Sequence, residues 1–356
     1  MGWRVLAASV AAVIVLAPTA VMAETSTATV RVGPMPVAVA VDELTNKAYV
    51  ATLLTDRVTV IDGVTRRTTR VKVGKAPVAL AVDVPTNEVY VADRDSNAVT
   101  VIDGATNRTR TIKVGKQPVA LALDARHQRV YVANFADDTV SVIDVRSGKV
   151  HAVHAGNNPR DLAVDPVTGR VYVAKHASNH VTVIDGKTKH TTQVDVGGRQ
   201  TGIAVDPVTH KVYVSRPHRS TVVIDGRSND VHDVRGRNTE AGSVAVNSHA
   251  GKAYLVGADR VMVVDVRTDR VVKVLRGPQP HGIDVDAKAN LTYVATTEYD
   301  PVAATYVGTV MAIDGTTDKR TSIDVSETPL ALAANPATRQ VYVTDGDGSA
   351  TIISPL

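Results

Sequence analysis

Cysteine is absent from this 356-residue chain, and aromatic residues are scarce. Without cysteine the chain has no disulfide, no thiolate zinc site, no covalently attached c-type haem and no cysteine nucleophile. Aromatic residues make up only 3% of the chain, whereas hydrophobic residues make up 44%. Val, Ala, Ile and Thr dominate, and a core rich in β-branched residues favours sheets over helices.

An excess of one charge is also absent. The chain has 40 basic and 36 acidic residues, a formal net charge of +4. This near balance does not force a nucleic-acid partner. Beyond the N-terminus, no apolar run is long enough to cross a bilayer.

Residues 1–23 have the organisation of a signal peptide. Arg4 supplies the positive charge, residues 5–16 are apolar, and residues 21–23 form a small-residue cleavage site before Glu24. A membrane anchor that stays uncleaved is the weaker alternative, because the apolar run is short for a span. The sequence therefore predicts cleavage before Glu24 and a periplasmic or secreted protein.

A repeat of about 41 residues fills the remainder, residues 24–356, which we predict to be a single domain. A tyrosine followed by Val or Leu recurs eight times, with gaps of 41, 41, 41, 41, 41, 39 and 49 residues. These tyrosines are Tyr49, Tyr90, Tyr131, Tyr172, Tyr213, Tyr254, Tyr293 and Tyr342. Self-similarity at such a period is typical of propellers and solenoids.

Each repeat unit has the pattern of four short strands, as residues 74–114 illustrate. Apolar runs at 77–83, 88–92 and 98–103 precede an alternating polar and apolar segment at 109–114, and turn residues separate them. The first strand is apolar at nearly every position, so we expect both of its faces to be buried. The fourth carries charged residues, as an exposed edge strand does.

This gradient of polarity predicts an all-β propeller whose blades bury their faces against one another. The last unit, residues 329–353, has no fourth strand, whereas residues 27–32 form an extra strand of that type. We therefore expect eight four-stranded blades, closed by pairing of the N-terminal strand with the C-terminal blade. A seven-bladed ring is the alternative.

Three motifs recur among the units. They are Val-Tyr-Val-Ala-Asn at residues 130–134, a Val-Ile-Asp-Gly turn at residues 60–63 and in three later units, and a Val-Gly-x-x-Pro start. Together they resemble the YVTN family of β-propeller repeats over nearly the whole domain. The resemblance implies an exported protein, often with seven blades, and implies little about activity because the fold hosts many functions.

Strand direction places the connecting loops on two faces of the ring. The turns of one face are alike and carry recurring aspartates such as Asp83 and Asp103, which we interpret as acceptors of backbone hydrogen bonds. The other face holds the loops before the first strand and between the second and third strands. Its sequence varies between units, and variable loops on a regular scaffold are typical of binding sites.

Units four to seven carry polar residues at the mouth of the central channel on that variable face. The residue after the first-strand proline is apolar in four units, whereas Arg160 and His281 take its place in units four and seven. The long loop of unit seven, residues 298–306, is long enough to overhang the mouth. We predict a binding site formed by Asn158, Arg160, Arg199, Gln200, Arg237, Glu240, Gln279 and His281.

Neighbouring loops of the same units add further basic side chains to the expected site. They are Lys175, His176, His180, Arg216, His218 and Arg219. Arginine side chains fork onto carboxylate or phosphate groups. The composition favours a non-catalytic exported binding or scaffold protein whose partner is a protein, a peptide or a small anionic ligand.

Two other classes of function remain as alternatives. A propeller lactonase or lyase could use Arg160, Glu240 and His281, provided that the histidine and the glutamate lie close together. No GxSxG elbow, phosphate-binding loop or dinucleotide motif supports an enzyme, and we favour the non-catalytic class. Nucleic-acid binding would use a basic rim that includes residues 57–75, but this rim has no interleaved aromatics for base stacking.

No metal or cofactor is predicted from the sequence. His176 and His180 share a loop, but a loop does not hold two side chains on one face as a helix does. No carboxylate accompanies them at the spacing of known ligand sets. We therefore expect neither residue to bind a metal.

Overall fold

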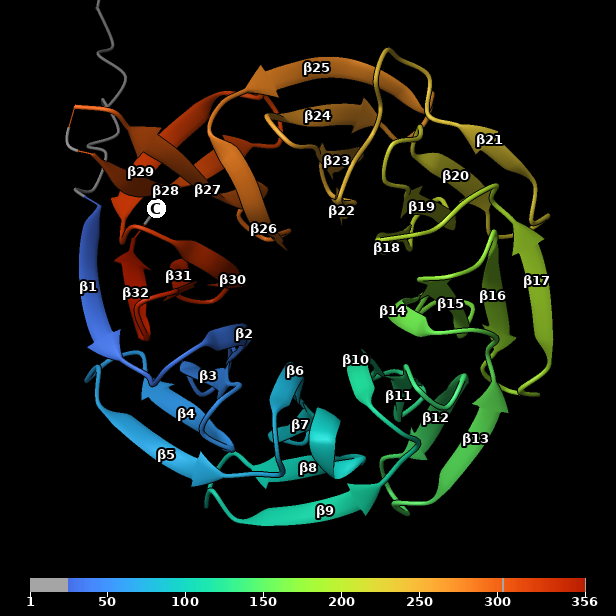
Figure 1. The fold of residues 1–356 in the computed structure, drawn as a ribbon, viewed down its shortest axis with the longest axis horizontal. Helices are drawn as coiled ribbons and strands as arrows, with labels where there is room; N and C mark the ends of the chain where they lie inside the picture. The colour runs from blue at the N-terminus through green and yellow to red at the C-terminus, as the bar shows by residue number, and fades with distance from the viewer. Residues whose placement is uncertain (1–24, 303, 356) are drawn as a thin grey trace, which may run out of the picture.

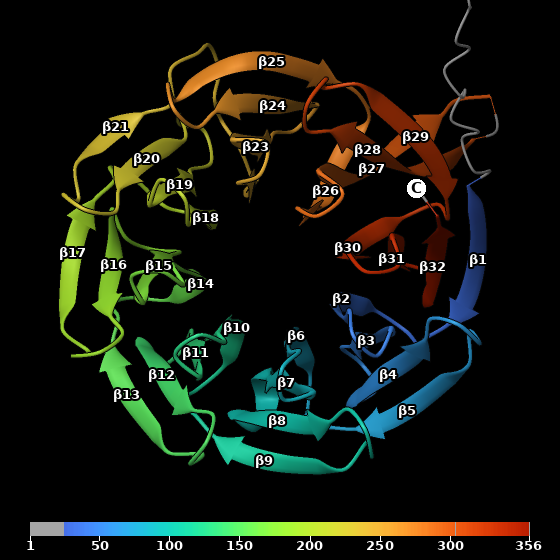
Figure 2. The same ribbon diagram turned by 180° about the vertical axis from the view of Figure 1, so that it is seen from behind.

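The computed structural model describes residues 25–302 and 304–355, which form eight four-stranded antiparallel sheets arranged in a ring (Figure 1, Figure 2). The region that the innermost strands surround is called the channel. The predicted all-β propeller with eight blades is thereby confirmed, and the seven-bladed alternative is wrong. The predicted signal peptide, residues 1–23, lies outside the described residues.

Blades are numbered here in chain order, and the strands of each are given from the channel outward. Blade 1 consists of β2 (Pro36–Asp42), β3 (Lys47–Thr52), β4 (Arg57–Asp62) and β5 (Thr68–Lys72), and blade 2 of β6 (Pro77–Asp83), β7 (Glu88–Asp93), β8 (Ala98–Asp103) and β9 (Thr109–Lys113). Blade 3 consists of β10 (Pro118–Asp124), β11 (Arg129–Asn134), β12 (Thr139–Asp144) and β13 (Val150–His154), and blade 4 of β14 (Pro159–Val164), β15 (Arg170–Lys175), β16 (His180–Asp185) and β17 (Thr191–Asp195).

The second half of the ring repeats this order. Blade 5 consists of β18 (Gly202–Asp206), β19 (Lys211–Ser215), β20 (Val222–Asp225) and β21 (Val231–Asp233), and blade 6 of β22 (Ser243–Asn247), β23 (Lys252–Val256), β24 (Arg260–Asp265) and β25 (Arg270–Arg276). Blade 7 consists of β26 (Gln279–Asp286), β27 (Leu291–Asp300), β28 (Thr305–Asp314) and β29 (Arg320–Val325), and blade 8 of β30 (Pro329–Asn335), β31 (Gln340–Asp345), β32 (Ser349–Ser354) and β1 (Ser26–Arg31).

The ring closes as the sequence predicts. The N-terminal strand β1 pairs antiparallel with β32 in an unbroken register from Ser26 opposite Ser354 to Arg31 opposite Ser349. Beyond the strand, the Val32 amide donates to the Gly348 carbonyl at 3.1 Å. Blade 8 thus consists of three strands from one end of the chain and one from the other.

The hydrophobic core lies between blades. Each cluster of buried residues joins two neighbours, as where Tyr172 and Val183 of blade 4 pack with Val212 and Val214 of blade 5. All eight repeat tyrosines are fully buried. No blade has a core of its own, so closure of the ring is needed to cover the faces of the first and last blades.

The innermost strands differ from the sequence expectation. In β2, β6 and β10 the five central residues are all half-buried, so these strands are not buried on both faces. Each innermost strand has a neighbour in its sheet on the outer side only, which leaves its inner backbone edge free. Because of this free edge, residues on both faces of the strand are only half-buried. That edge lines the channel.

Two further features bear on function. Strands β27 and β28 are ten residues each, and Figure 1 places the tip of their hairpin at the outer edge of the ring instead of over the mouth. Within the part of the chain that the structure describes, the only helix is the short turn η1 (Arg94–Ser96), and no helix is long and apolar enough to cross a membrane.

Candidate functional site

A β-bulge at the start of the innermost strand directs one side chain of most blades toward the mouth. In blade 2, Pro77 pairs with Asp93 and Ala79 with Ala92, so Val78 has no partner opposite it. The same shift leaves Arg160 unpaired in blade 4. Bulges re-aim side chains and recur beside functional sites. The position after the first-strand proline, which is apolar in some blades and polar in others, is therefore the bulged residue.

Arg160 is exposed and lines a cavity of ≈ 420 Å³ over blades 2 to 4. We call this cavity the arginine pocket. Its other lining residues are Val78, Arg94, Gln117, Val119 and Phe135. Two guanidinium groups thus lie at the edge of a surface formed by two valines and the only phenylalanine of the chain.

The positive charge of this region extends to blade 5. Burial, together with Arg199 and Arg160 nearby, lowers the pKa of His176 below its usual range. The ring of His176 lies 6.2 Å from that of Phe135. Arg160 and Arg199 are both exposed, and no described residue forms an ion pair with either. In particular, no ion pair joins Arg160 to Glu240 among the described residues.

Two of the predicted site residues are engaged by backbone groups of neighbouring segments. Gln200 is fully buried: its Oε1 accepts from the Lys175 amide at 2.8 Å, and its Nε2 donates to the Ser178 carbonyl at 2.7 Å. Asn158 donates from Nδ2 to the Phe135 carbonyl at 3.1 Å and has a φ of 52°. Both side chains shape the mouth loops, so we leave them out of the proposed site.

Two basic side chains that the sequence places at the mouth are turned into the blades. Lys175 is buried and donates to Gln193 Oε1 at 2.8 Å. Arg216 is also buried and forms an ion pair with Asp233 at 2.8 Å. Such partners within a blade are not visible in a sequence pattern, because they come from neighbouring strands.

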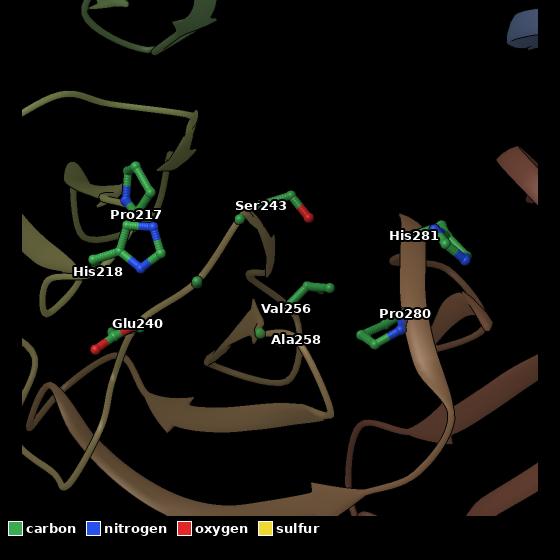
Figure 3. A pocket seen from close by; sticks show the side chains of 11 residues that line it. Pro217, His218, Glu240, Ser243, Val256, Ala258, Pro280 and His281 are labelled. Carbon is green, nitrogen blue, oxygen red and sulfur yellow. The ribbon is translucent and has the colours of Figure 1, made fainter. Parts of the chain in front are cut away.

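A second cavity of ≈ 370 Å³ lies over blades 5 to 7, and Glu240 and His281 belong to its lining. Figure 3 shows Pro280 and His281 on opposite sides of β26, with Glu240 across the cavity. Burial alone lowers the pKa of His281, with no contribution from a carboxylate. The structure therefore does not bring together the histidine and glutamate that a lactonase or lyase would need. Arg237 and Gln279 are exposed and line neither cavity.

Two carboxylates inside the channel were missed by the sequence analysis. Asp161 accepts a hydrogen bond from the Ile203 amide of blade 5 at 3.3 Å, and Asp284 accepts one from the Ala334 amide of blade 8 at 2.9 Å. Each carboxylate thus pairs a free amide on the inner edge of the next blade. Burial raises the pKa of both carboxyls to about 6.

A sequence signal for these two residues exists. The register of Asp161 holds only small residues in the other blades, and that of Asp284 holds only alanine. The residues are Ala38, Ala79, Ala120, Gly202, Ser243, Gly282 and Ala331 in the first register, and Ala40, Ala81, Ala122, Ala163, Ala204, Ala245 and Ala333 in the second. A lone aspartate in an otherwise small-residue register marks a side chain that departs from the structural repeat.

Replacing both channel carboxyls, as Asp161→Asn with Asp284→Asn, is expected to change how stability depends on pH. Their folded pKa of about 6 lies above the ordinary 3.8, so the unfolded chain loses these protons first as pH rises. Wild-type stability should therefore fall between about pH 4 and pH 6. Near neutral pH each asparagine should add about 1–3 kcal/mol to the free energy of unfolding.

Urea unfolding on both sides of this pH window measures the effect. Asp185→Asn is the control, because backbone hydrogen bonds from Thr188 lower the pKa of Asp185, and its loss should destabilise at neutral pH. A double variant with the same pH slope as the wild type would contradict the placement of the carboxyls.

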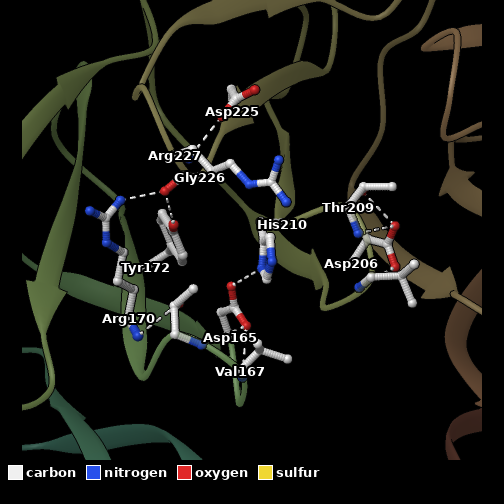
Figure 4. Close-up of polar contacts among 12 residues, drawn as sticks. Asp165, Val167, Arg170, Tyr172, Asp206, Thr209, His210, Asp225, Gly226 and Arg227 are labelled. Carbon is white, nitrogen blue, oxygen red and sulfur yellow. Dashed lines mark hydrogen bonds and ion pairs between the residues drawn. The ribbon is translucent and has the colours of Figure 1, made fainter.

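The opposite face of the ring is built from links between blades. Arg170 of blade 4 donates to the Gly226 carbonyl of blade 5, and His210 Nδ1 lies 2.7 Å from Asp165 Oδ2 (Figure 4). A Cβ on Gly226 would lie 2.3 Å from the His210 carbonyl oxygen and 2.7 Å from the Tyr172 hydroxyl. This crowding explains the glycine of the Val-Ile-Asp-Gly turn.

The recurring aspartates of that face have the structural role expected from the sequence. In blade 2, Asp103 Oδ1 accepts from the amides of Ala105 and Thr106, both at 2.9 Å, and these bonds lower the pKa of Asp103. Within residues 25–302 and 304–355, no three His, Asp or Glu side chains are grouped as a metal site would require.

Comparison with known proteins places the chain in a fold class. No family model and no curated protein matches it. Three solved structures are similar, and the first is the dihydro-heme d1 dehydrogenase NirN in complex with DHE, with a TM-score of 0.69, 16% identity and coverage of 89% of this chain and 73% of that one. Hydrazine synthase of Kuenenia stuttgartiensis has a TM-score of 0.61 and 15% identity, and the match covers 90% of this chain and 96% of that one. The computationally designed Ika8 protein has a TM-score of 0.74 and 16% identity, and the match covers 90% of this chain and 97% of that one.

At these identities the likeness shows the fold alone. The chain is an eight-bladed β-propeller built from sequence repeats.

Proposed function

We propose that this propeller binds a small organic anion with an apolar body in the arginine pocket. The observation that carries the proposal is Arg160 in the pocket lining together with Arg199 beyond it. Both are exposed, both contribute to the lowered pKa of His176, and neither has an ion-pair partner among the described residues. Val78, Val119 and Phe135 supply the apolar contact. Small-molecule sites are typically concave and mostly apolar, with a few polar groups that orient the ligand.

Arg160 and Arg199 carry positive charge that no ion pair neutralises among the described residues. Guanidinium groups donate in a fixed fork that matches a carboxylate or a phosphate, and such charge-assisted bonds are the stronger class. The positive charge near His176 already disfavours its protonation. An anion bound at Arg160 would offset part of that positive charge, so binding should raise the pKa of His176 toward its ordinary value.

Isothermal titration of the mature protein with phenylacetate, hexanoate and phenyl phosphate tests the proposal. The neutral phenylacetamide, which keeps the ring and loses the charge, serves as the matched probe. Arg160→Ala with Arg199→Ala should weaken anion binding about 100-fold, since each lost charge-assisted hydrogen bond costs about 1.5 kcal/mol. The control variant is Arg66→Ala with Arg67→Ala, which removes two exposed arginines on the opposite face.

The outcomes separate the candidate surfaces. Equal binding of phenylacetamide, or unchanged binding in the Arg160 and Arg199 variant, would overturn the proposal. Loss of binding in the Arg66 and Arg67 variant would move the function to the basic rim, where a nucleic-acid partner is the alternative.

We also propose that the protein is exported to a periplasm or to the outside, as a YVTN-type repeat protein that acts by binding and not by catalysis. The support is the signal-peptide organisation of residues 1–23 and the repeat motifs described above. Mass spectrometry of exported protein should find Glu24 as the first residue. A chain that retains Met1 would contradict the proposed cleavage.

A further inference from the structure

The one long insertion in the repeat carries the two tyrosines that the repeat does not use. Of ten tyrosines, eight occupy the buried repeat position. The other two, Tyr299 and Tyr306, lie opposite each other on β27 and β28 and are each 53% exposed. Their rings are 5.3 Å apart in an edge-on arrangement. We call residues 298–300 and 305–307 the tyrosine hairpin.

This hairpin is acidic as well as aromatic. Glu298 precedes Tyr299, and Glu327 lies beside the hairpin, where its Oε1 accepts from Thr305 Oγ1 at 3.3 Å. Residues 291–356 contain eight acidic and three basic residues, a net charge of −5. Tyrosine is enriched among the residues that contribute most to protein interfaces. An exposed tyrosine pair on a projecting acidic hairpin therefore indicates a docking element for a basic surface.

Such a basic surface exists on the same molecule, at the outer rim of blades 1 and 2. Residues 57–116 contain eleven basic and six acidic residues, a net charge of +5. Between β5 and β9 lies a cavity of ≈ 360 Å³, which we call the rim groove. Its lining includes Lys72, Val73, Ala98, Thr100, Thr111 and Lys113.

The rim groove has the features that the tyrosine hairpin requires. Val73 and Ala98, both largely buried, add apolar atoms to its lining, and the hydroxyls of the exposed Thr109 and Thr111 offer partners for a phenolic oxygen. Lys72 and Lys113 are exposed on the outermost strands and have no ion-pair partner among the described residues. Their ammonium groups are available to carboxylates that flank a docked ring.

We propose that the tyrosine hairpin of one copy docks into the rim groove of a second copy of this chain. The ring of the tyrosine enters the groove, while Glu298 and Glu327 pair with Lys72 and Lys113. Because two different surfaces meet, the contact is heterologous and builds either a closed ring or an open filament of propellers. The charge separation along the chain supports this partner over an unrelated one, since both halves of the contact are present.

Sedimentation velocity of the mature protein over a range of concentrations and ionic strengths tests the proposal. We expect association at low salt that weakens as salt screens the ion pairs. Reversal of the groove charges, Lys72→Glu with Lys113→Glu, and reversal of the hairpin charges, Glu298→Lys with Glu327→Lys, should each weaken association at least about tenfold. Mixing these two variants should restore a complex, because each then supplies the charge that the other needs.

Two further variants complete the design. Tyr299→Ser with Tyr306→Ser should also abolish association while leaving the urea midpoint unchanged, since both side chains are exposed. Arg227→Glu with Arg267→Glu makes the same charge change as the groove variant on exposed turns of blades 5 and 6, and should leave association unchanged. A wild-type protein that remains monomeric at low salt, or a variant mixture that fails to associate, would overturn the proposal.

Discussion

Removal of residues 26–31 is expected to leave a chain that no longer folds to a stable ring. Without β1, strand β32 becomes the exposed outer edge of a three-stranded blade 8, and six paired positions of the ladder are lost. At about 1 kcal/mol per lost hydrogen bond, the destabilisation is on the order of 5 kcal/mol, comparable to the whole stability of many domains. An unprotected edge also promotes aggregation.

Circular dichroism and light scattering during heating measure this outcome. A chain that begins at residue 25 keeps every strand of the ring and is the control. Should the chain that lacks residues 26–31 melt at the same temperature as this control, without aggregating, closure by β1 would not be what stabilises the ring.

Tyr213→Ala is expected to lower the free energy of unfolding by about 3–5 kcal/mol, the range for removal of a large buried side chain. The residue is fully buried, and its hydroxyl donates to Asp269 Oδ1 at 2.9 Å. Lys211 and His232 also contact that carboxylate, at 2.6 Å and 3.0 Å. The tyrosine therefore packs between blades 5 and 6 and holds one corner of a polar cluster that joins them.

Two companion variants separate the contribution of packing from that of the hydroxyl hydrogen bond. Tyr213→Phe keeps the packing and loses one hydrogen bond, so it should cost about 1 kcal/mol. Tyr299→Ala removes an exposed tyrosine and should change stability by less than about 0.5 kcal/mol. Urea unfolding curves measure all three. Equal losses for the alanine and phenylalanine variants of Tyr213 would mean that the hydroxyl, and not the packing, is what matters.

The fold could be predicted from the sequence because its information is local and repeated. Alternation of apolar residues, turn residues at regular offsets and a tyrosine every 41 residues each act within one unit, and eight repetitions of the same signal leave little ambiguity. Even closure of the ring was visible, since one terminal unit lacks a strand of the type that the other terminus supplies. The recurring turn aspartates were read correctly for the same reason.

The candidate site was predictable only as a face. Arg160, Glu240 and His281 do line cavities at the mouth, but Gln200 and Asn158 are engaged by loop backbone. Arg94 and Phe135 of the arginine pocket were missed, because they come from blades whose innermost strands look ordinary in the sequence. A loop residue has no periodic pattern that reports whether its side chain faces solvent, a cavity or a neighbouring strand.

The sequence by itself therefore determined the architecture: strands, blades, their number and the way the ring closes. Tertiary structure alone decided which polar side chains are available, because that depends on contacts between residues 20 to 300 positions apart, as for Lys175 with Gln200 or Asp284 with Ala334. It also decided that Asp161 and Asp284 lie inside the channel, where burial raises their pKa to about 6. Strand-forming propensity is a property of a segment, whereas burial and electrostatic surroundings are properties of the assembled ring.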